Sequence, residues 1–316
     1  MIEATALTKR YGTTVAVEDL SFTVRPGHVT GFLGPNGAGK STTMRMILGL
    51  DRPTSGSVAV DSQRFADLPW PLHQVGALLD AHAVHGGRTA QAHLSALARS
   101  NGVGTSRVWT VLDQVGLASV AGKRVRGFSL GMKQRLGIAA ALLGDPGILI
   151  FDEPVNGLDP EGIRWIRELF RQLAAEGRTV LVSSHLMSEM ALTADHLLII
   201  GRGRLIGDTS VVDFVAAAGA TRLIVRSSDD VELARLLLAR GAVVEPMVER
   251  AGIGVTGVPA ELIGDLAADR HLSIYELRTE SASLEDAFMR LTADHAEYRA
   301  PFNPPTGSPA PAPEYL

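Results

Sequence analysis

The sequence contains no cysteine, which excludes disulfide bonds, cysteine zinc sites and thiol catalysis. It also lacks long apolar runs. The longest, such as Leu197–Ile200, are far shorter than the roughly 20 residues of a membrane-spanning helix. The N-terminus MIEATALTKRYG has no apolar stretch typical of a signal peptide. We therefore expect a soluble chain that stays in the cytoplasm and reaches a membrane only through another protein.

Lysine is scarce too: only Lys9, Lys40, Lys123 and Lys133 occur, and arginine carries the remaining positive charge. The net charge of -4 does not suggest the basic surface of a nucleic-acid-binding protein, so we expect no nucleic-acid partner. Hydrophobic residues make up 46% and charged residues 20%, which is an ordinary globular balance. A length of 316 residues predicts about two domains.

Predicted strands and helices alternate over residues 1–215. In the segment 20–25 apolar and polar residues alternate, as in a half-buried strand, and VTGFLG, ILIFDEP and TVLVSSH are apolar runs typical of buried strands. Helices are expected at 41–50, within 90–145 and at 161–176, and a hairpin follows near Gly201 and Gly203. This order predicts an α/β fold with a mixed, mostly parallel sheet.

The pattern changes near residue 216, where a second domain is expected over 220–294. Its predicted order is strand, helix, strand, strand, helix, strand, which is the β-α-β-β-α-β order of a small α+β, ferredoxin-like domain. A last helix at 283–294 begins with a capping box formed by Ser283 and Asp286. The proline-rich tail at 299–316 is predicted to be disordered.

The segment GPNGAGKS fits the phosphate-binding pattern G-x-x-x-x-G-K-[ST] between a predicted strand and a predicted helix. Its glycines allow several backbone N–H groups to point at a phosphate, and the helix N-terminus adds a positive dipole. Lys40 is expected to reach the β- and γ-phosphates, and the Ser41 hydroxyl to bind Mg²⁺. The predicted nucleotide-binding residues here are Gly34, Pro35, Asn36, Gly37, Ala38, Gly39, Lys40, Ser41 and Thr42.

Two carboxylates end the apolar strand ILIFDEP. Asp152 is expected beside the phosphate loop as a carboxylate for Mg²⁺, and Glu153 as the general base that polarises the attacking water. His185 follows TVLVSS at the same edge of the sheet, where it would sense the γ-phosphate and orient Glu153. The alternative is an Asp-Glu pair that merely ends a strand in solvent, with a structural histidine nearby.

The motifs together resemble the ATP-binding subunit of ABC transporters over about residues 2–210. They occur in the family's order: Tyr11, GPNGAGKST, FSLGMKQR, ILIFDEP, NGLD and SSH. FSLGM takes the place of the family signature, whose common form is Leu-Ser-Gly-Gly-Gln. Ser129 and the amide of Gly131 lie at a predicted helix start, which favours an anion. The alternative is that Ser129 only caps the helix.

The resemblance implies a P-loop ATPase that hydrolyses ATP with Mg²⁺. Two copies would pack head to tail around two ATP molecules, so that the signature (Ser129, Leu130, Gly131 and Met132) binds the γ-phosphate held by the other subunit. A homodimer is expected, although the sequence leaves a heterodimer open. Tyr11 would stack on adenine, Val17 would line the ribose, and Asp159 would couple the two sites. For an aromatic residue beside a strand, the alternative is a place in the core.

The chain departs from the family pattern at two places. Leu130 and Met132 replace a glycine and a glutamine of the signature, while the phosphate-facing pair is kept. After the strand HQVGALL, Asp80 stands where the family has a Mg²⁺-contacting glutamine, and it is a further metal candidate. Near it, His82, His85 and His93 raise the alternative of a separate metal site.

The sequence GMKQR at residues 131–135 resembles that found in the branch of antibiotic- and daunorubicin-resistance-type exporters. We therefore expect the ATPase of an exporter of drugs, antibiotics or lipid-like cargo, driving a separate polytopic permease from the cytoplasmic face of the cell membrane. The C-terminal domain would serve dimerisation or regulation. An ABC importer ATPase and a soluble ABC ATPase acting on ribosomes or DNA remain the alternatives.

Overall fold

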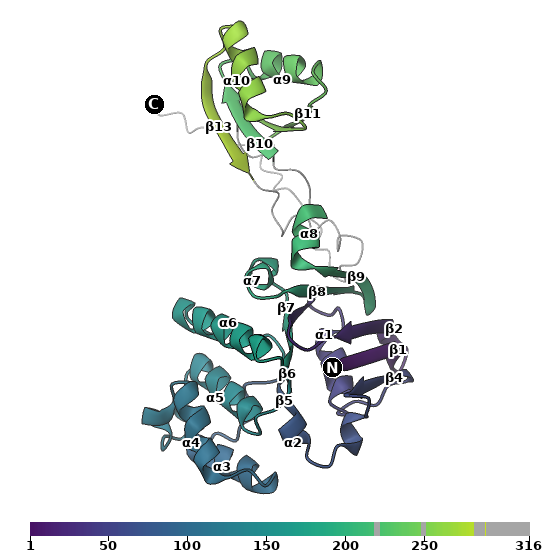
Figure 1. Ribbon diagram of the computed structural model, residues 1–316, viewed down its shortest axis with the longest axis vertical. Coiled ribbons are helices and arrows are strands. Elements are labelled where there is room, and N and C mark those ends of the chain that lie inside the picture. Colours follow the sequence, from purple (N-terminus) through teal and green to yellow (C-terminus); the bar gives the residue numbers. More distant parts are fainter. Residues whose placement is uncertain (218–221, 248–250, 281–287, 289–316) are drawn as a thin grey trace, which may run out of the picture.

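The structure, a computed structural model, describes residues 1–217, 222–247, 251–280 and 288. Residues 1–217 form a layered α/β region, and residues 222–280 form a smaller unit with its own sheet (Figure 1). Apart from Phe288, the predicted helix at 283–294 with its capping box and the tail at 299–316 lie outside the described residues.

The main sheet has six strands in the order β5-β6-β7-β3-β8-β9. All neighbours are parallel except β8 and β9, which form the predicted hairpin, so the mixed, mostly parallel sheet is confirmed. Because parallel strands share a direction, the segments that follow β3, β6 and β7 emerge at one edge. The strands are β3 (Val29–Leu33), β5 (Val75–Leu78), β6 (Ile148–Phe151), β7 (Thr179–Ser184), β8 (His196–Gly201) and β9 (Arg204–Ser210).

A smaller antiparallel sheet, in the order β2-β1-β4, lies on one side of the main sheet (Figure 1). The alternating residues Leu20, Phe22 and Val24 of β2 are buried in the core that it shares with the main sheet. The helix α1 (Lys40–Ile47) contributes to the same core and is shorter than predicted, because Gly49 has a left-handed φ of 65°. The strands are β1 (Ile2–Tyr11), β2 (Thr14–Val24) and β4 (Ser55–Val60).

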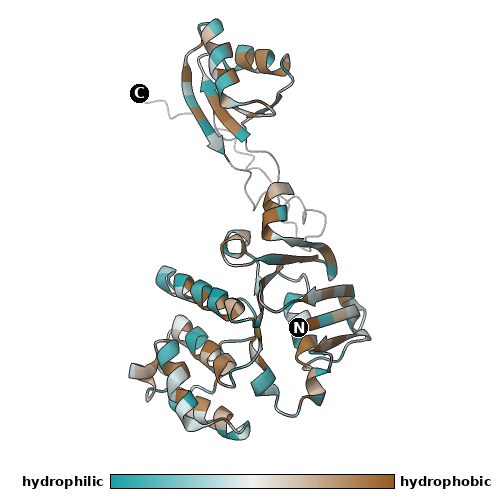
Figure 2. Cartoon of the chain, viewed as in Figure 1, coloured by the Kyte–Doolittle hydropathy of each residue, from teal (hydrophilic) through white to brown (hydrophobic). Residues whose placement is uncertain are grey.

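Helices cover the other side of the main sheet and enclose a second apolar core (Figure 1). Hydrophilic and hydrophobic residues both occur along α6 in Figure 2, and its buried residues Ile166, Leu169 and Phe170 have the spacing of an amphipathic helix. The longer helices are α3 (Ala90–Ser100), α4 (Thr105–Gln114), α5 (Leu130–Leu142) and α6 (Pro160–Ala175). Short turns of helix are α2 (Pro71–Gln74), η1 (Phe65–Asp67), η2 (Ala118–Val120), η3 (Val125–Gly127), α7 (Met187–Ala191) and α8 (Val211–Ala217).

The smaller unit has the predicted β-α-β-β-α-β order, and its sheet is antiparallel throughout in the order β11-β12-β10-β13. Its own core contains Val225, Leu233, Leu237 and Ile263. The acidic start of the first helix is a cap, since Asp229 accepts hydrogen bonds from two helix amides. The elements are β10 (Arg222–Ser227), α9 (Asp230–Leu238), β11 (Val243–Pro246), β12 (Ile253–Thr256), α10 (Ala260–Asp269) and β13 (Ile274–Glu280).

Two features bear on the domain boundary. The helix α8 continues past residue 215, the predicted end of the first domain, to Ala217, and β10 begins at Arg222. Phe288, which the prediction assigned to the second domain, is 6% exposed and belongs to the helical core of the first region, as does Phe214. None of the helices in the described part of the chain is long and apolar enough to cross a membrane.

Candidate functional site

The phosphate loop connects the end of β3 to α1 and surrounds a cavity of about 220 Å³. Its glycines are needed for the close approach of the backbone. A Cβ at Gly34 would lie 2.5 Å from the Ile200 carbonyl oxygen, and Gly39 has a φ of 101°. The residues that line this cavity are Ala16, Pro35, Asn36, Gly37, Ala38, Gly39, Lys40, Ser41, Thr42, Asp152 and Glu153.

The Lys40 side chain is buried within the loop. Its amine donates hydrogen bonds to the carbonyl oxygens of Gly34 (2.6 Å) and Pro35 (3.2 Å), and lies 3.8 Å from Glu153 Oε1. Burial lowers the pKa of Lys40, while the charges of Glu153 and Asp152 act in the opposite direction. The loop therefore holds the Lys40 amine beside the cavity, at the place where a bound phosphate would need a cation.

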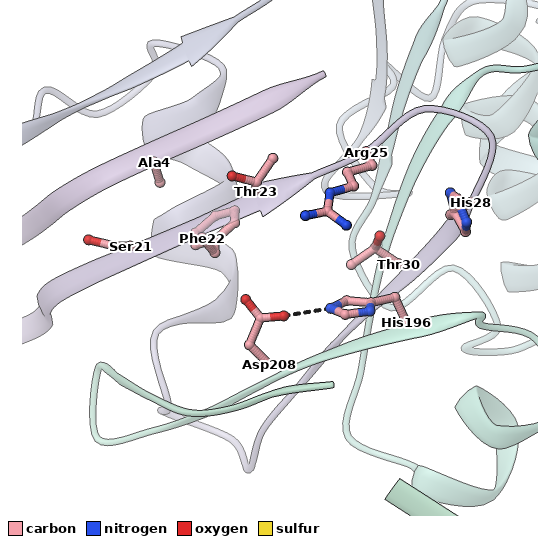
Figure 3. Close-up of a pocket in the computed structure, with 9 residues that line it drawn as sticks. All are labelled: Ala4, Ser21, Phe22, Thr23, Arg25, His28, Thr30, His196 and Asp208. Carbon is pink, nitrogen blue, oxygen red and sulfur yellow. Dashed lines mark hydrogen bonds and ion pairs between the residues drawn. The ribbon is translucent and has the colours of Figure 1, made fainter. Parts of the chain in front are cut away.

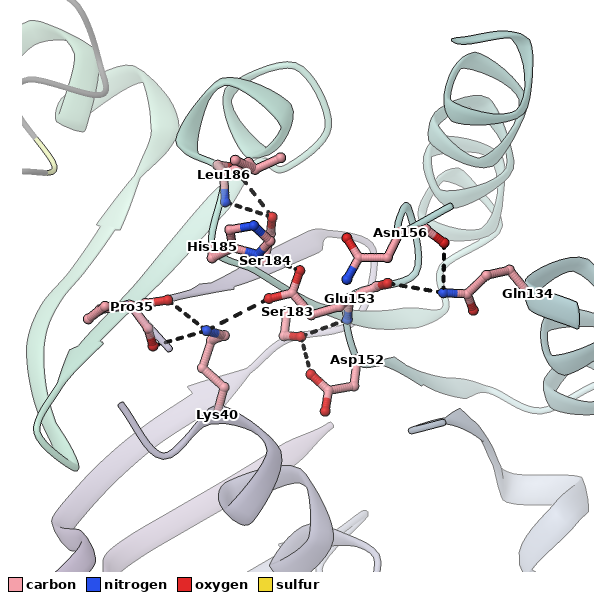
Figure 4. A network of polar contacts seen from close by, with 11 residues as sticks. Pro35, Lys40, Gln134, Asp152, Glu153, Asn156, Ser183, Ser184, His185 and Leu186 are labelled. Carbon is pink, nitrogen blue, oxygen red and sulfur yellow. Dashed lines mark hydrogen bonds and ion pairs between the residues drawn. The ribbon is translucent and has the colours of Figure 1, made fainter. Parts of the chain in front are cut away.

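The two acidic residues at the end of β6 are both bound by Ser183, a fully buried residue of β7, one through its carboxylate and the other through its backbone N–H (Figure 4). Its hydroxyl donates to Asp152 Oδ1 and accepts the backbone N–H of Glu153 at 2.9 Å. Parallel pairing of β6 with β7 places Phe151 opposite Val182, which brings the next residues together. Ser183 is not among the site residues predicted from the sequence, where the signal for it is the pair of serines that ends the run TVLVSS.

Glu153 lies between two basic side chains from two other loops (Figure 4). One carboxylate oxygen is 3.8 Å from Lys40 Nζ, and the other is 2.9 Å from His185 Nδ1. The sheet thus brings the two predicted catalytic residues, Glu153 and His185, into contact. A carboxylate that is partly buried and aimed into the cavity can accept a proton from a water molecule there.

Tyr11 ends β1 and is 47% exposed, so it is not a core residue. Its hydroxyl donates to Asp51 at 2.9 Å, and Lys9 Nζ lies 4.9 Å from the ring centroid. Val17 has no exposed surface and packs against the loop at Gly39, and its predicted contact with a ribose stays a prediction. The neighbouring residue Ala16, which the sequence analysis missed, lines the cavity instead.

The predicted signature forms the start of α5, outside the phosphate-loop cavity. Ser129 caps the helix, since its hydroxyl accepts the Met132 N–H at 3.2 Å. Gly131 and Leu130 both contact the loop at Gly157: a Cβ on Gly131 would lie 2.9 Å from the Gly157 carbonyl oxygen, and one on Gly157 would lie 2.3 Å from Leu130 Cδ2.

Asp159 begins α6 on the far side of the same loop, where its carboxylate accepts the Gly162 N–H at 2.8 Å. This contact is an ordinary helix N-cap. It gives Asp159 a structural role within the chain, and the predicted coupling between two subunits stays a prediction.

Asp80 is not brought to the phosphate loop. It is exposed and does not line the cavity, and its carboxylate accepts the backbone N–H of His82 at 2.7 Å, as in a turn. Its predicted place in the metal site stays a prediction that this geometry does not support. Within the described residues, no group of three or more His, Asp or Glu side chains could hold a metal ion, which argues against the separate histidine site.

Ser41 and Asp152 do line one cavity with the phosphate loop. Mg²⁺ in such sites is bound by one or two protein oxygens together with substrate phosphates and water. A hydroxyl and a carboxylate are a donor set of that kind, so the residues present fit Mg²⁺.

A second cavity, of about 340 Å³, lies at the opposite ends of the strands, between β2 and the β8-β9 hairpin (Figure 3). Thr30 and His196, at the starts of β3 and β8, line it together with Asp208, which is 2.5 Å from the His196 ring. It is larger than the phosphate-loop cavity but contains none of its residues. The nucleotide site is therefore assigned by its chemistry and not by its volume.

Comparisons with known proteins agree with this geometry. A family model described as "ABC transporter" matches residues 17–156, and a domain of unknown function matches residues 221–285. The chain is 36% identical over 300 residues to the uncharacterized ABC transporter ATP-binding protein YhcH of Bacillus subtilis (strain 168), covering 94% of this chain and 97% of that protein. The chain belongs to the ABC transporter ATP-binding proteins. It is an ATPase whose ATP hydrolysis is coupled to transport, as predicted.

Two further relatives of this ABC ATPase have named transport roles. The Bacitracin transport ATP-binding protein BcrA of Bacillus licheniformis is 44% identical over 65% of this chain and 68% of its own length. The Nod factor export ATP-binding protein I of Rhizobium leguminosarum bv. viciae is 33% identical over 94% of this chain and 96% of its own length. The resemblance to exporters of this branch is therefore confirmed.

Solved structures show the same fold. The ATP-binding subunit of an ABC transporter matches with a TM-score of 0.63 and 29% identity, over 69% of this chain and 92% of that one. A dimeric ATP-binding cassette bound to ADP and phosphate matches with a TM-score of 0.62, over 67% of this chain and 99% of that one. At 24% identity the second match supports the fold alone.

Proposed function

We propose that this ABC ATPase drives an exporter of an antibiotic, drug or lipid-like molecule, as a subunit bound to a separate membrane permease at its cytoplasmic face. The whole-length similarity to a Nod factor export protein and the similarity to a bacitracin transport protein support this proposal. An importer ATPase and an ABC ATPase without a permease are the competing functions.

The position of Ser129 is the observation that supports a head-to-tail dimer. It is exposed at the N-terminus of a 13-residue helix, yet it does not line the cavity of its own phosphate loop. Its oxygen accepts the Met132 N–H, which leaves the hydroxyl proton available as a donor. Such a helix start favours an anion. A second copy packed head to tail would supply that anion as the γ-phosphate of its ATP.

Within one site, each residue has a distinct task. Lys40 neutralises charge on the β- and γ-phosphates, and Mg²⁺ held by Ser41 and Asp152 would polarise the same oxygens. Glu153 accepts a proton from the attacking water, and His185 holds the carboxylate in place through its Nδ1 contact. Tyr11 supplies a half-exposed aromatic ring for the adenine.

For the C-terminal unit, we propose a ferredoxin-like domain that regulates or assists dimerisation. The strand order β11-β12-β10-β13 supports this class, because the two strands that flank α9 in the sequence are separated in the sheet by β12. No catalytic group of side chains was found in its sequence.

Glu153→Gln tests the proposed mechanism. The amide keeps the size of the side chain but cannot accept the proton, so we expect kcat to fall by about 10²- to 10⁴-fold. ATP binding should persist, and size-exclusion chromatography with ATP should show a trapped dimer. Glu161→Gln, an exposed position in the first turn of α6, is the matched control. Normal turnover by Glu153→Gln would reject the assigned base.

An affinity-tagged form of Glu153→Gln distinguishes the competing functions when it is purified from membranes of its native cell in mild detergent. A stoichiometric polytopic permease supports transport. A partner set that also includes an extracytoplasmic binding protein favours import. Recovery with ribosomal or DNA-associated proteins alone would reject the exporter and leave the ATP site unaffected.

A further inference from the structure

The backbone of Glu153 has an unusual conformation, with a φ of 47°. Residues other than glycine rarely adopt this left-handed region, and they do so where the surroundings determine it. Here both peptide groups of the residue are held by side chains from other elements. Its N–H donates to Ser183 Oγ of β7 at 2.9 Å, and its carbonyl oxygen accepts Gln134 Nε2 of α5 at 3.3 Å.

Gln134 is a buried residue of α5, the helix that begins with the signature and is called the signature helix below. Its exposed surface is 5%. Its Nε2 group makes a second hydrogen bond, to the carbonyl oxygen of Asn156 at 3.2 Å (Figure 4). Its other polar atom, Oε1, is buried without a hydrogen-bond partner among the described residues. A buried acceptor without a partner is unfavourable. The presence of a glutamine at this buried position is therefore explained by the two hydrogen bonds that its Nε2 group donates.

The start of α5 and the loop 153–157 are also in contact at other residues. At the start of α5, Leu130 lies against Gly157, and Gly131 lies close to the Gly157 carbonyl oxygen. One turn later in α5, Gln134 donates to two carbonyl oxygens of the loop 153–157, those of Glu153 and Asn156. The signature helix thus contacts the loop 153–157 in its first turn, through Leu130 and Gly131, and again one turn later, through Gln134.

We propose that Gln134 is a positioning residue that links the signature helix to the general base. Through it, a nucleotide bound at Ser129 and Gly131 from the partner subunit biases the orientation of Glu153 in this chain's own site. The inference rests on the proposed head-to-tail dimer. Within each subunit, Gln134 would then connect the anion site at Ser129 and Gly131, which binds the partner's nucleotide, to the site where that subunit hydrolyses its own ATP.

Gln134→Met tests this role, because methionine has a similar shape and no donor. We expect kcat to fall by about tenfold or more, while KM for ATP and the affinity for a fluorescent ATP analogue change by less than about twofold. The melting temperature should stay within about 3 °C of wild type, since the change also removes the unsatisfied acceptor. Gln134→Glu should be slower still, because it places an oxygen against two carbonyl oxygens.

Gln172→Met is the matched control, at an exposed position on α6, and should be indistinguishable from wild type. In a double-mutant cycle, the effect of Gln134→Met on kcat should be smaller in a Ser129→Ala background, because the signature then binds the partner's nucleotide less well. Fully additive effects would overturn the link to the signature.

Two results would overturn the positioning role itself. One is a kcat within about twofold of wild type for both Gln134 variants. The other is a parallel loss of kcat, ATP affinity and melting temperature, which a merely structural residue would produce. Failure of the proposed function is seen separately, as absence of ATP hydrolysis by the wild type or of an ATP-dependent dimer of Glu153→Gln.

Discussion

At the scale of single residues, Tyr11 shows how a binding surface is fixed before its ligand arrives. The ring is half exposed, but its hydroxyl donates to Asp51, which is also held by Arg45 at 2.7 Å. Burial and the Asp51 carboxylate raise the pKa of Tyr11, so the hydroxyl remains a protonated donor at neutral pH. A ring held in this way loses little freedom when a base stacks on it.

We therefore expect Tyr11→Ala to weaken ATP binding by about 5- to 150-fold, the range that a stacking energy of about 1–3 kcal/mol gives. Tyr11→Phe keeps the ring and should lose much less. The measurement is the Kd for ATP by isothermal titration, with Tyr275→Ala as the control because Tyr275 is 62% exposed on β13. Equal affinities for Tyr11→Ala and wild type would exclude stacking.

At the scale of elements, α5 depends on its close packing against β5. A Cβ on Gly76 of β5 would lie 1.9 Å from the Ala141 carbonyl oxygen, a distance that no side chain can occupy. A Cβ on Gly144, just after the helix, would lie 2.0 Å from the Leu72 carbonyl oxygen. Backbone cannot yield as a flexible side chain does, so the register of the signature helix is set by glycines remote from the nucleotide.

Gly76→Ala should consequently destabilise the ATPase region by about 1–3 kcal/mol or more, because α5 must move away from β5. Thermal or urea unfolding measures this, and Gly122→Ala, where nothing lies within 4 Å of the new methyl group, is the control. We also expect a lower kcat, since the displaced helix carries Gln134. If both alanine variants unfold like wild type, the close packing of β5 with α5 does not limit stability.

The sequence was most informative where one local pattern determines the geometry. The phosphate loop, the apolar strand before Asp152 and the β-α-β-β-α-β order are patterns of this kind. It was least informative where a contact depends on strand register or on two distant segments. Ser183 and Gln134 reach the loop of Glu153 from β7 and α5, and Asp80 turns to its own loop, which no spacing in the sequence reveals.

At the scale of the whole molecule, the chain has three apolar cores in the described residues, and one of them joins distant parts of the sequence. The core of the C-terminal unit is closed on itself and includes Leu237, which has no exposed surface. Phe288 follows that unit in the sequence but is buried in the core of the ATPase region, which also includes Phe214. Phe288 therefore contributes to the stability of the ATPase region.

Phe288→Ala should destabilise the ATPase region by about 3–5 kcal/mol, the usual loss for a buried phenylalanine. For a region of this size the melting temperature would fall by roughly 10 °C. Calorimetry with and without ATP identifies the transition concerned, because only the nucleotide-binding region is stabilised by ATP. Leu237→Ala should instead lower the transition that ATP does not shift. If Phe288→Ala lowers only that ATP-insensitive transition, Phe288 belongs to the C-terminal unit and not to the ATPase core.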